Sequence, residues 1–457
     1  MPSRACVLFA LAILAGCSGG CDGERAKPPV NPKSIGGAAN DANLANPDGP
    51  EPVQAGYLDV PAGALDHFFR GLDGAETQQP TGRVLMAFFG DSHTASDSMT
   101  SRIRHTFQDR FGDAGRGLVA AGRPPARHYY QRDVRYGASG AWKAAVGGHR
   151  DPEPFGIVGM RVYGERKGAQ LWVETCADCP AGKTVAQFEV LYLAAPEHGT
   201  LKYRVDEQPW QQLRTKTAEV EAPHPARQVI VVPDGPHKLT LEHAGGGVID
   251  LFGVVLERQR PGVIVDSLGV VGRRLGSLRS WDWSIIGEQL ATRDPRLVVL
   301  QYGTNESDDP DLDLEALATY YDETILRIRA AAPTASIIIL GPPDVATREL
   351  GKRCDRMKPS ADGSVIPECQ WRTPNVLREI IAVEHAAAVR NKVVFFDTFA
   401  AMGGGDKMDG WFLGEPKLAY KDRVHFTDLG YQTWADALTG ALLAEYDRWR
   451  RTQVAPR

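Results

Sequence analysis

The sequence predicts an α/β fold with a parallel sheet, interrupted by an inserted β-sandwich. Two observations support this prediction. In the first and last parts of the chain, short apolar runs alternate with helical stretches, which is the order of elements that builds a parallel sheet. Between residues 148 and 258 this alternation stops, and short strand-like stretches separated by turns replace it.

Five apolar runs are expected to form the parallel sheet. Each run is continuous rather than alternating, as expected for a strand that is buried on both faces. The runs lie at residues 84–89, 263–265, 297–300, 337–340 and 393–396, and the expected helices lie at 96–111, 314–331, 373–389 and 428–449. The carboxyl ends of parallel strands meet at one edge of the sheet, where open α/β folds bind their ligands.

The stretch at 148–258 predicts a separate β-sandwich. Residues 201–205 alternate between apolar and polar side chains, and no convincing helix interrupts the region. Trp172, Tyr203 and Trp210 can form a face on which sugars stack. Aromatic side chains in a sandwich more often belong to its core, so we favour the core position.

The composition is that of a soluble globular protein. The 457 residues are 43% hydrophobic and 24% charged, which suffices for a sizeable core. The formal net charge is −5, and the basic residues are scattered along the chain. Nucleic-acid binding is therefore not expected, because it requires a concentrated basic surface.

The N-terminus predicts export. Arg4 precedes a short apolar stretch that ends in Leu-Ala-Gly-Cys at 14–17, which suits a signal peptide and is too short to cross a bilayer. This ending resembles the lipobox of bacterial lipoproteins, in which Cys17 carries the lipid, and Ser18 resembles the outer-membrane kind. A plain secretory signal is the alternative. We expect a cell-envelope protein that faces the periplasm and contacts the membrane through its N-terminal lipid only.

The expected domain order follows from these segments. Residues 18–52 are rich in Gly, Pro, Asn and Ala and have few large apolar side chains, so they predict a flexible tether. The segments are a lipoprotein signal peptide at 1–16, the tether at 17–56, the first part of the α/β domain at 57–147, the β-sandwich insert at 148–258 and the second part of the α/β domain at 259–452.

Export also decides how the cysteines are interpreted. In an oxidising compartment Cys354 and Cys369 are expected to form a disulfide that closes a loop. Cys176 and Cys179 can form a redox pair, a zinc site or a local disulfide. We favour the local disulfide, because no second cysteine or histidine pair lies nearby to complete a metal site.

Three motifs follow predicted strands of the sheet. The motif Gly-Asp-Ser-His at 90–93 exposes a serine at the end of the first strand, where its backbone N–H can also receive an oxyanion. Gly269 and Gly272 follow the second strand, and a glycine there can bring its N–H close to a substrate oxygen. In the motif Gly-Thr-Asn-Glu at 303–306, the amide of Asn305 can donate to an oxyanion.

A fourth motif, Asp-Arg-Val-His at 422–425, precedes a helix that Thr427 can cap. Asp422 and His425 are close enough in a turn for a hydrogen bond, and the carboxylate then fixes the imidazole tautomer for base catalysis. His93 lies next to the serine and is a second candidate for the base. Because adjacent side chains point apart on an extended strand, we favour a packing or substrate-contact role for it.

Together the four motifs resemble those of the SGNH (GDSL-type) hydrolases. The resemblance implies a flavodoxin-like three-layer fold and a serine hydrolase site with no metal and no other cofactor. In such a site Ser92 is the nucleophile, His425 the base and Asp422 the acid that orients the base. The oxyanion hole consists of the Ser92 and Gly272 N–H groups and the Asn305 side chain, and Gly272 is chosen for its spacing to the asparagine.

A closer resemblance is to bacterial peptidoglycan O-acetylesterases. It rests on residues 111–117, 255–257 and 261–263 and on the position of the insert, which in those proteins is a jelly roll like a carbohydrate-binding module. It implies a serine esterase whose substrate is an acetylated glycan of the cell envelope. A glycan O-acetyltransferase with the same triad and a non-catalytic glycan-binding lipoprotein remain as alternatives.

Overall fold

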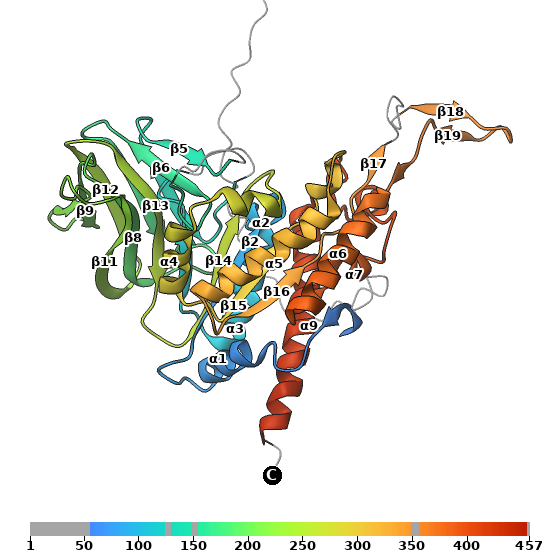
Figure 1. Ribbon diagram of the computed structural model, residues 1–457, viewed down its shortest axis with the longest axis horizontal. Helices are drawn as coiled ribbons and strands as arrows, with labels where there is room; N and C mark the ends of the chain where they lie inside the picture. Colours follow the sequence, from blue (N-terminus) through green and yellow to red (C-terminus); the bar gives the residue numbers. More distant parts are fainter. Residues whose placement is uncertain (1–54, 124–128, 149–153, 349–355, 455–457) are drawn as a thin grey trace, which may run out of the picture. The chain divides into compact units, whose positions relative to one another are not determined.

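The computed structural model describes residues 55–123, 129–148, 154–348 and 356–454 (Figure 1). The predicted signal peptide, Cys17 and nearly all of the predicted tether lie outside these residues, and so does Cys354. The predicted lipidation and the predicted Cys354–Cys369 disulfide therefore stay predictions. None of the helices in the described ranges has the length and apolar character needed to cross a membrane.

The central sheet of the described chain has six strands in the order β1-β21-β16-β15-β2-β14. They are β1 (Leu58–Asp59), β2 (Arg83–Gly90), β14 (Gly262–Gly269), β15 (Leu297–Gln301), β16 (Ser336–Leu340) and β21 (Val394–Phe396). All neighbouring pairs are parallel except β1 with β21. Numbered along the chain, the five parallel strands lie in the order 2-1-3-4-5, which is the flavodoxin-like order. The predicted fold class is confirmed.

Helices cover both faces of this sheet, because strands such as β2 are apolar on both sides. Val84, Met86 and Phe88 of β2 pack with α1 (Asp66–Glu76), α3 (Ser98–Phe111) and α9 (Asp428–Val454). Ala87 and Phe89 pack with α4 (Trp283–Arg293), α5 (Leu314–Ala331) and α6 (Asn375–Asn391) (Figure 1). The shorter elements are α2 (Ser92–Ala95), α7 (Thr398–Ala401), α8 (Met408–Leu413), β17 (Thr347–Arg348), β18 (Met357–Pro359), β19 (Val365–Pro367) and β20 (Trp371–Arg372).

The inserted region folds as two antiparallel sheets that share one apolar core. One sheet contains β10 (Gln211–Arg214), β9 (Thr200–Val205), β12 (Lys238–Gly245), β7 (Gln170–Thr175) and β4 (Val134–Ala138). The other contains β11 (His224–Gly235), β8 (Val185–Ala194), β13 (Ile249–Glu257), β6 (Met160–Gly164) and β5 (Lys143–Val146), and β3 (Gly115–Val119) also pairs with β13. The antiparallel strands thus begin before residue 148, where the sequence had placed the start of the insert.

The aromatic side chains of the insert do not share one face. Tyr203 is buried in the sandwich core, and its strand neighbour Leu241 lies in the same core. Trp172 pairs with Thr240 instead, in the alternate register that points away from that core, and the Lys238 ammonium lies 4.4 Å from the centre of its ring. A sugar-stacking face made of Trp172, Tyr203 and Trp210 together is therefore excluded, because Tyr203 belongs to the core.

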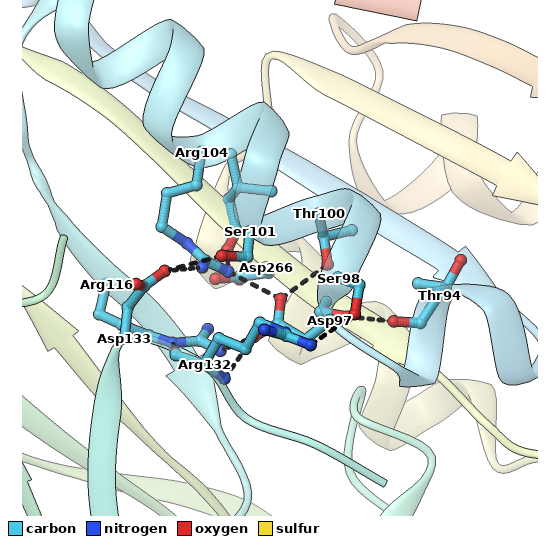
Figure 2. Close-up of polar contacts among 12 residues, drawn as sticks. Thr94, Asp97, Ser98, Thr100, Ser101, Arg104, Arg116, Arg132, Asp133 and Asp266 are labelled. Carbon is cyan, nitrogen blue, oxygen red and sulfur yellow. Dashed lines mark hydrogen bonds and ion pairs between the residues drawn. The ribbon is translucent and has the colours of Figure 1, made fainter. Parts of the chain in front are cut away.

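Buried ion pairs join the first part of the α/β domain to the loop that leads into β4 (Figure 2). Arg104 of α3 donates to Asp133 at 2.6 Å and to Asp97 at 3.1 Å, and Arg116 of β3 donates to Asp97 at 2.6 Å. The side chains of all four residues are at most 2% exposed. Removing one member of such a network leaves an unpaired buried charge, so this loop is held firmly against α3.

The Cys-Ala-Asp-Cys loop after β7 contains a disulfide between Cys176 and Cys179. Because metals bind thiolates rather than disulfides, this pair is not a zinc site in the oxidised state.

Candidate active site

Ser92 lies where the buried strand β2 turns into a helix. It is the first residue of α2, directly after β2 and Asp91. The Asp91 carboxylate accepts a hydrogen bond from the His93 backbone N–H at 2.8 Å, which fixes this turn. Gly269, at the end of β14, packs so closely on the turn that a methyl group there would come within 2.2 Å of the Ala95 nitrogen. The nucleophile predicted from the sequence thus has a rigid support.

Ser92, His425 and Asp422 form one chain of hydrogen bonds. The Ser92 Oγ lies 2.8 Å from His425 Nε2, and His425 Nδ1 lies 2.8 Å from Asp422 Oδ2. With Nδ1–H donating to the carboxylate, Nε2 is left to accept the serine proton. The backbone N–H groups of Val424 and His425 both donate to Asp422 Oδ1 at 3.1 Å, so the carboxylate is held on its other oxygen as well.

The electrostatics of the site favour a base with a raised pKa. Burial alone would lower the pKa of His425, but the hydrogen bond to Asp422 and the charge of that carboxylate raise it above its ordinary value. Burial alone would raise the pKa of Asp422, but its hydrogen bonds with His425 and the Val424 N–H lower it to about 2. Asp422 is therefore ionised at neutral pH and supports the charge that His425 acquires when it takes a proton.

The helix that follows His425 begins as predicted, because Thr427 Oγ1 accepts from the Gly430 N–H at 3.2 Å. His93 is fully buried, its Nδ1 lies 3.0 Å from the Tyr431 hydroxyl, and its ring packs against Phe426 and Trp434. Burial holds the pKa of His93 well below its usual value. His93 is thus a neutral packing residue behind the triad, in line with the role favoured from the sequence.

The predicted oxyanion residues Gly272 and Asn305 lie in adjacent loops. The Asn305 side-chain amide donates to the Arg273 carbonyl at 3.1 Å, which leaves its second N–H for another acceptor. Gly272 has φ +70°, and a methyl group there would meet no atom within 4 Å, so the site is open above it. The loop of Gly272 follows β14, and the loop of Asn305 follows β15. These two strands are the neighbours of β2, the strand that leads to Ser92.

A buried carboxylate joins these two loops. Glu306 Oε1 accepts from the Leu275 N–H at 2.7 Å, and Oε2 accepts from the Gly303 N–H at 2.9 Å. Glu306 is 1% exposed, and burial raises its pKa, while the two N–H groups favour its charged form. The Arg274 Nε also donates to the Asn305 carbonyl at 3.1 Å. Glu306 therefore sets the position of one oxyanion loop against the other.

A cavity of about 640 Å³ adjoins the oxyanion residues. Its lining includes Gly272 and Asn305 together with Leu312, Leu317 and Tyr320. The lining also includes five acidic residues, Glu306, Asp308, Asp309, Asp311 and Asp313, and one cation, Arg274. There is thus room beside the predicted oxyanion hole for more of a substrate than one acetyl group.

Sequence reasoning found Ser92, Gly272, Asn305, Asp422 and His425, and the structure brings the three triad members into contact and the two oxyanion residues to one cavity. It did not single out Glu306. The sequence did contain a signal for Glu306. It directly follows Asn305, close to the end of an apolar strand, where a side chain is expected to be buried.

This geometry can be compared with known proteins. Residues 236–433 match the GDSL-like lipase/acylhydrolase family, a segment that contains Gly272, Asn305, Asp422 and His425 but not Ser92. No curated protein matches the sequence. The family match therefore includes the predicted base, its orienting acid and two oxyanion residues, but not the predicted nucleophile.

Among solved structures, a peptidoglycan O-acetylesterase superposes with a TM-score of 0.68 at 22% sequence identity, over 86% of this chain and 99% of that chain. A family two carbohydrate esterase from Cellvibrio japonicus aligns with a TM-score of 0.25 at 11% identity, over 69% of this chain and 98% of that chain. The resemblance to SGNH/GDSL hydrolases, and to the fold of a peptidoglycan O-acetylesterase with its β-rich insert, is confirmed.

Proposed function

We propose that the protein is a serine esterase that removes O-acetyl groups from peptidoglycan in the bacterial cell envelope. The observation that supports this most is the hydrogen-bonded chain from Ser92 through His425 to Asp422. A hydroxyl, a base and an orienting carboxylate in this order are what nucleophilic acyl transfer requires.

In the first half of the reaction, Ser92 Oγ attacks the carbonyl carbon of the acetyl ester while its proton passes to His425 Nε2. The negative charge that develops on the carbonyl oxygen is stabilised by the N–H groups of Ser92 and Gly272 and by the Asn305 amide. The C–O bond to the sugar then breaks, and His425 returns the proton to the departing sugar oxygen. The product is an acetyl-enzyme on Ser92 and a free sugar hydroxyl.

In the second half, water takes the place of the sugar. His425 removes a proton from the water as it attacks the acetyl carbon, and the same proton returns to Ser92 Oγ when the acyl bond breaks. Acetic acid leaves, and the enzyme regains its starting state. Neither half of the reaction as proposed uses a metal or any other cofactor.

The choice of glycan has two supports. The fold resembles that of a peptidoglycan O-acetylesterase over most of both chains. The sequence at 14–17 also predicts export, and we propose that a lipid on Cys17 holds the enzyme at the outer membrane, facing the periplasm. In that compartment an acetylated cell-wall glycan is within reach.

The test is release of acetate by the purified protein from O-acetylated peptidoglycan, with acetylated xylan as the competing substrate. We expect faster release from peptidoglycan and no release by Ser92→Ala, which removes the attacking oxygen. Activity of Ser92→Ala within tenfold of wild type would refute the mechanism. Preference for xylan would refute the glycan while leaving the serine esterase in place.

A further inference from the structure

Two tyrosines are unusually exposed. In the residues that the structure describes, Tyr130 is 53% and Tyr420 is 54% exposed, and every other phenylalanine, tyrosine or tryptophan side chain is buried or half-buried. The two residues lie 290 positions apart in sequence (420 − 130). Exposed aromatic rings lose hydrophobic stabilisation, so two such rings at one site indicate a binding role.

Both tyrosines are hydrogen-bonded through their backbones to segments that carry the predicted triad. The Tyr130 N–H donates to the carbonyl of Ala95 at 3.1 Å, and Ala95 ends the short helix that Ser92 begins. The Tyr420 N–H donates to the His425 carbonyl at 2.8 Å. One tyrosine is therefore fixed beside the nucleophile and the other beside the base.

The two side chains also lie within electrostatic reach of each other. Burial raises the pKa of Tyr420, and the neighbouring Asp428 and Tyr130 raise it further. Arg132, two residues after Tyr130, opposes this rise. Tyr130, Tyr420 and the start of α9 are therefore near one another, close to the triad.

The loop that carries Tyr130 is firmly held. The Arg132 N–H donates to Asp97 Oδ2 at 2.8 Å, and the Arg132 guanidinium donates to Ser98 Oγ at 2.8 Å (Figure 2). The same guanidinium also donates to Asp428 Oδ1 at 2.6 Å. The Tyr129 hydroxyl donates to the Gly269 carbonyl. Because Asp428 begins the helix that follows His425, Arg132 joins the loop of Tyr130 to the part of the chain that carries the base and Tyr420.

We propose that Tyr130 and Tyr420 form a stacking subsite for sugar rings of the glycan next to the scissile acetyl group, an inference that rests on the proposed esterase function. A pyranose presents one face of C–H groups, which packs on an aromatic ring, while its hydroxyls stay in water. A tyrosine suits this position because it offers an apolar ring with a polar tip. Because the backbone of each tyrosine is already held by a hydrogen bond in the free enzyme, these loops lose little freedom when the glycan binds.

The insert offers a weaker alternative. Trp172 and Trp210 are half-buried, and the cations of Lys238, Lys202 and Arg204 lie over their rings. A sugar would have to displace these side chains before it could stack there. The rings of Tyr130 and Tyr420 are more exposed, and their backbones are hydrogen-bonded to Ala95 and His425, in the segments that carry the nucleophile and the base, rather than lying on a separate sheet.

The experiment compares two substrates that share the acetyl group. One is p-nitrophenyl acetate, which has no sugar, and the other is a preparation of soluble fragments of O-acetylated peptidoglycan. The readout is the ratio of kcat/KM for the fragments to kcat/KM for p-nitrophenyl acetate. Tyr130→Ala and Tyr420→Ala should each lower this ratio by about 2- to 12-fold, the range typical of one aromatic stacking contact, mainly through a higher KM for the fragments.

Three further variants make the result specific. Tyr130→Phe and Tyr420→Phe keep the ring and should restore most of the ratio. Tyr163→Ala removes a half-buried tyrosine on β6, in the insert, and should leave the ratio within twofold of wild type. Ratios within twofold of wild type for both alanine variants, or equal losses in the Phe and Ala variants, would overturn the subsite alone. Failure of the wild-type protein to release acetate from the fragments would refute the proposed function itself.

Discussion

The position of the oxyanion hole should depend on Glu306. In Glu306→Gln one oxygen remains for one of the two loop N–H groups, while the new NH₂ group faces the other and leaves it without an acceptor. A buried N–H without an acceptor costs about 1–3 kcal/mol. If that cost appears when the loops must hold the transition state, kcat falls by about 5- to 150-fold. This lies at or below the loss of about 10²–10³ seen when an oxyanion donor is removed outright.

The assay for this prediction is a double-mutant cycle on hydrolysis of p-nitrophenyl acetate. Glu306→Gln should lower kcat with little change in KM, and its effect should shrink markedly once Asn305→Ala has already disabled the oxyanion hole. Additive losses in the two variants would refute the argument, because a residue that acts through the oxyanion hole cannot act independently of it.

A second buried carboxyl provides the matched control. Glu384 accepts from the Tyr321 hydroxyl at 2.7 Å, and burial raises its pKa well above the usual value. Because burial disfavours the charged form of this carboxyl, Glu384→Gln removes little that the core relies on and should keep kcat within about threefold of wild type. The melting temperatures of both variants are then compared. A lower melting temperature in both variants would indicate a damaged core, whereas a displaced loop affects Glu306→Gln only.

Three other outcomes are expected. Asp422→Asn should cost less activity than His425→Ala, since the carboxylate orients the base rather than transferring the proton; the reverse order would mean that the roles are misassigned. The kcat/KM should rise with pH through the raised pKa of His425, and in Asp422→Asn this midpoint should move to lower pH, because the negative charge that stabilises the imidazolium is lost; a midpoint that stays or rises would contradict this. Cys17→Ser should move the protein from the membrane to the soluble fraction, and a variant that still sediments with membranes would contradict the predicted lipid anchor.

The five parallel strands of the sheet were predictable because each of them is an apolar run buried on both faces. The runs at 84–89, 297–300 and 337–340 coincide with β2, β15 and β16 to within one residue at each end. Two longer helices, α1 and α4, were missed, and so were the short helices α2, α7 and α8. Gly71 and Gly74 weaken the helical signal in α1, yet a methyl group at Gly71 would come within 3.1 Å of Val84, so the glycine serves close packing on β2.

The start of the insert was missed for a different reason. The strand β4 alternates over only five residues, one of them Gly137, and β5 consists of Lys143, two alanines and a valine with no alternation, so neither gives a strong strand signal. They form because each adds to the edge of a stronger sheet, β4 beside β7 and β5 beside β6. This stabilisation is tertiary, and no local pattern in the sequence reveals it.

The residues of the site also differ in whether a local pattern in the sequence reveals them. Ser92 and Asn305 stand in short motifs next to strand ends, and Asp422 and His425 stand in a short motif before a helix, so residue type and local position together reveal them. Tyr130 has no such context, because its place beside the triad depends on contacts with Ala95 and with the loop held by Arg132.

Arg104 shows why these contacts escape a reading of the sequence. It lies within the helix of Ser98–Phe111, where an arginine ordinarily faces water, yet its side chain is fully buried between Asp97 and Asp133. Each of these charges is costly in the core by itself and tolerable only with the others, so the network is stable only as a whole. Asp97 precedes and Asp133 follows the stretch that contains Tyr130, and the Arg104 guanidinium binds both aspartates. The same ion pairs that bind the insert to α3 therefore also fix the distance between the nucleophile turn and the proposed sugar subsite.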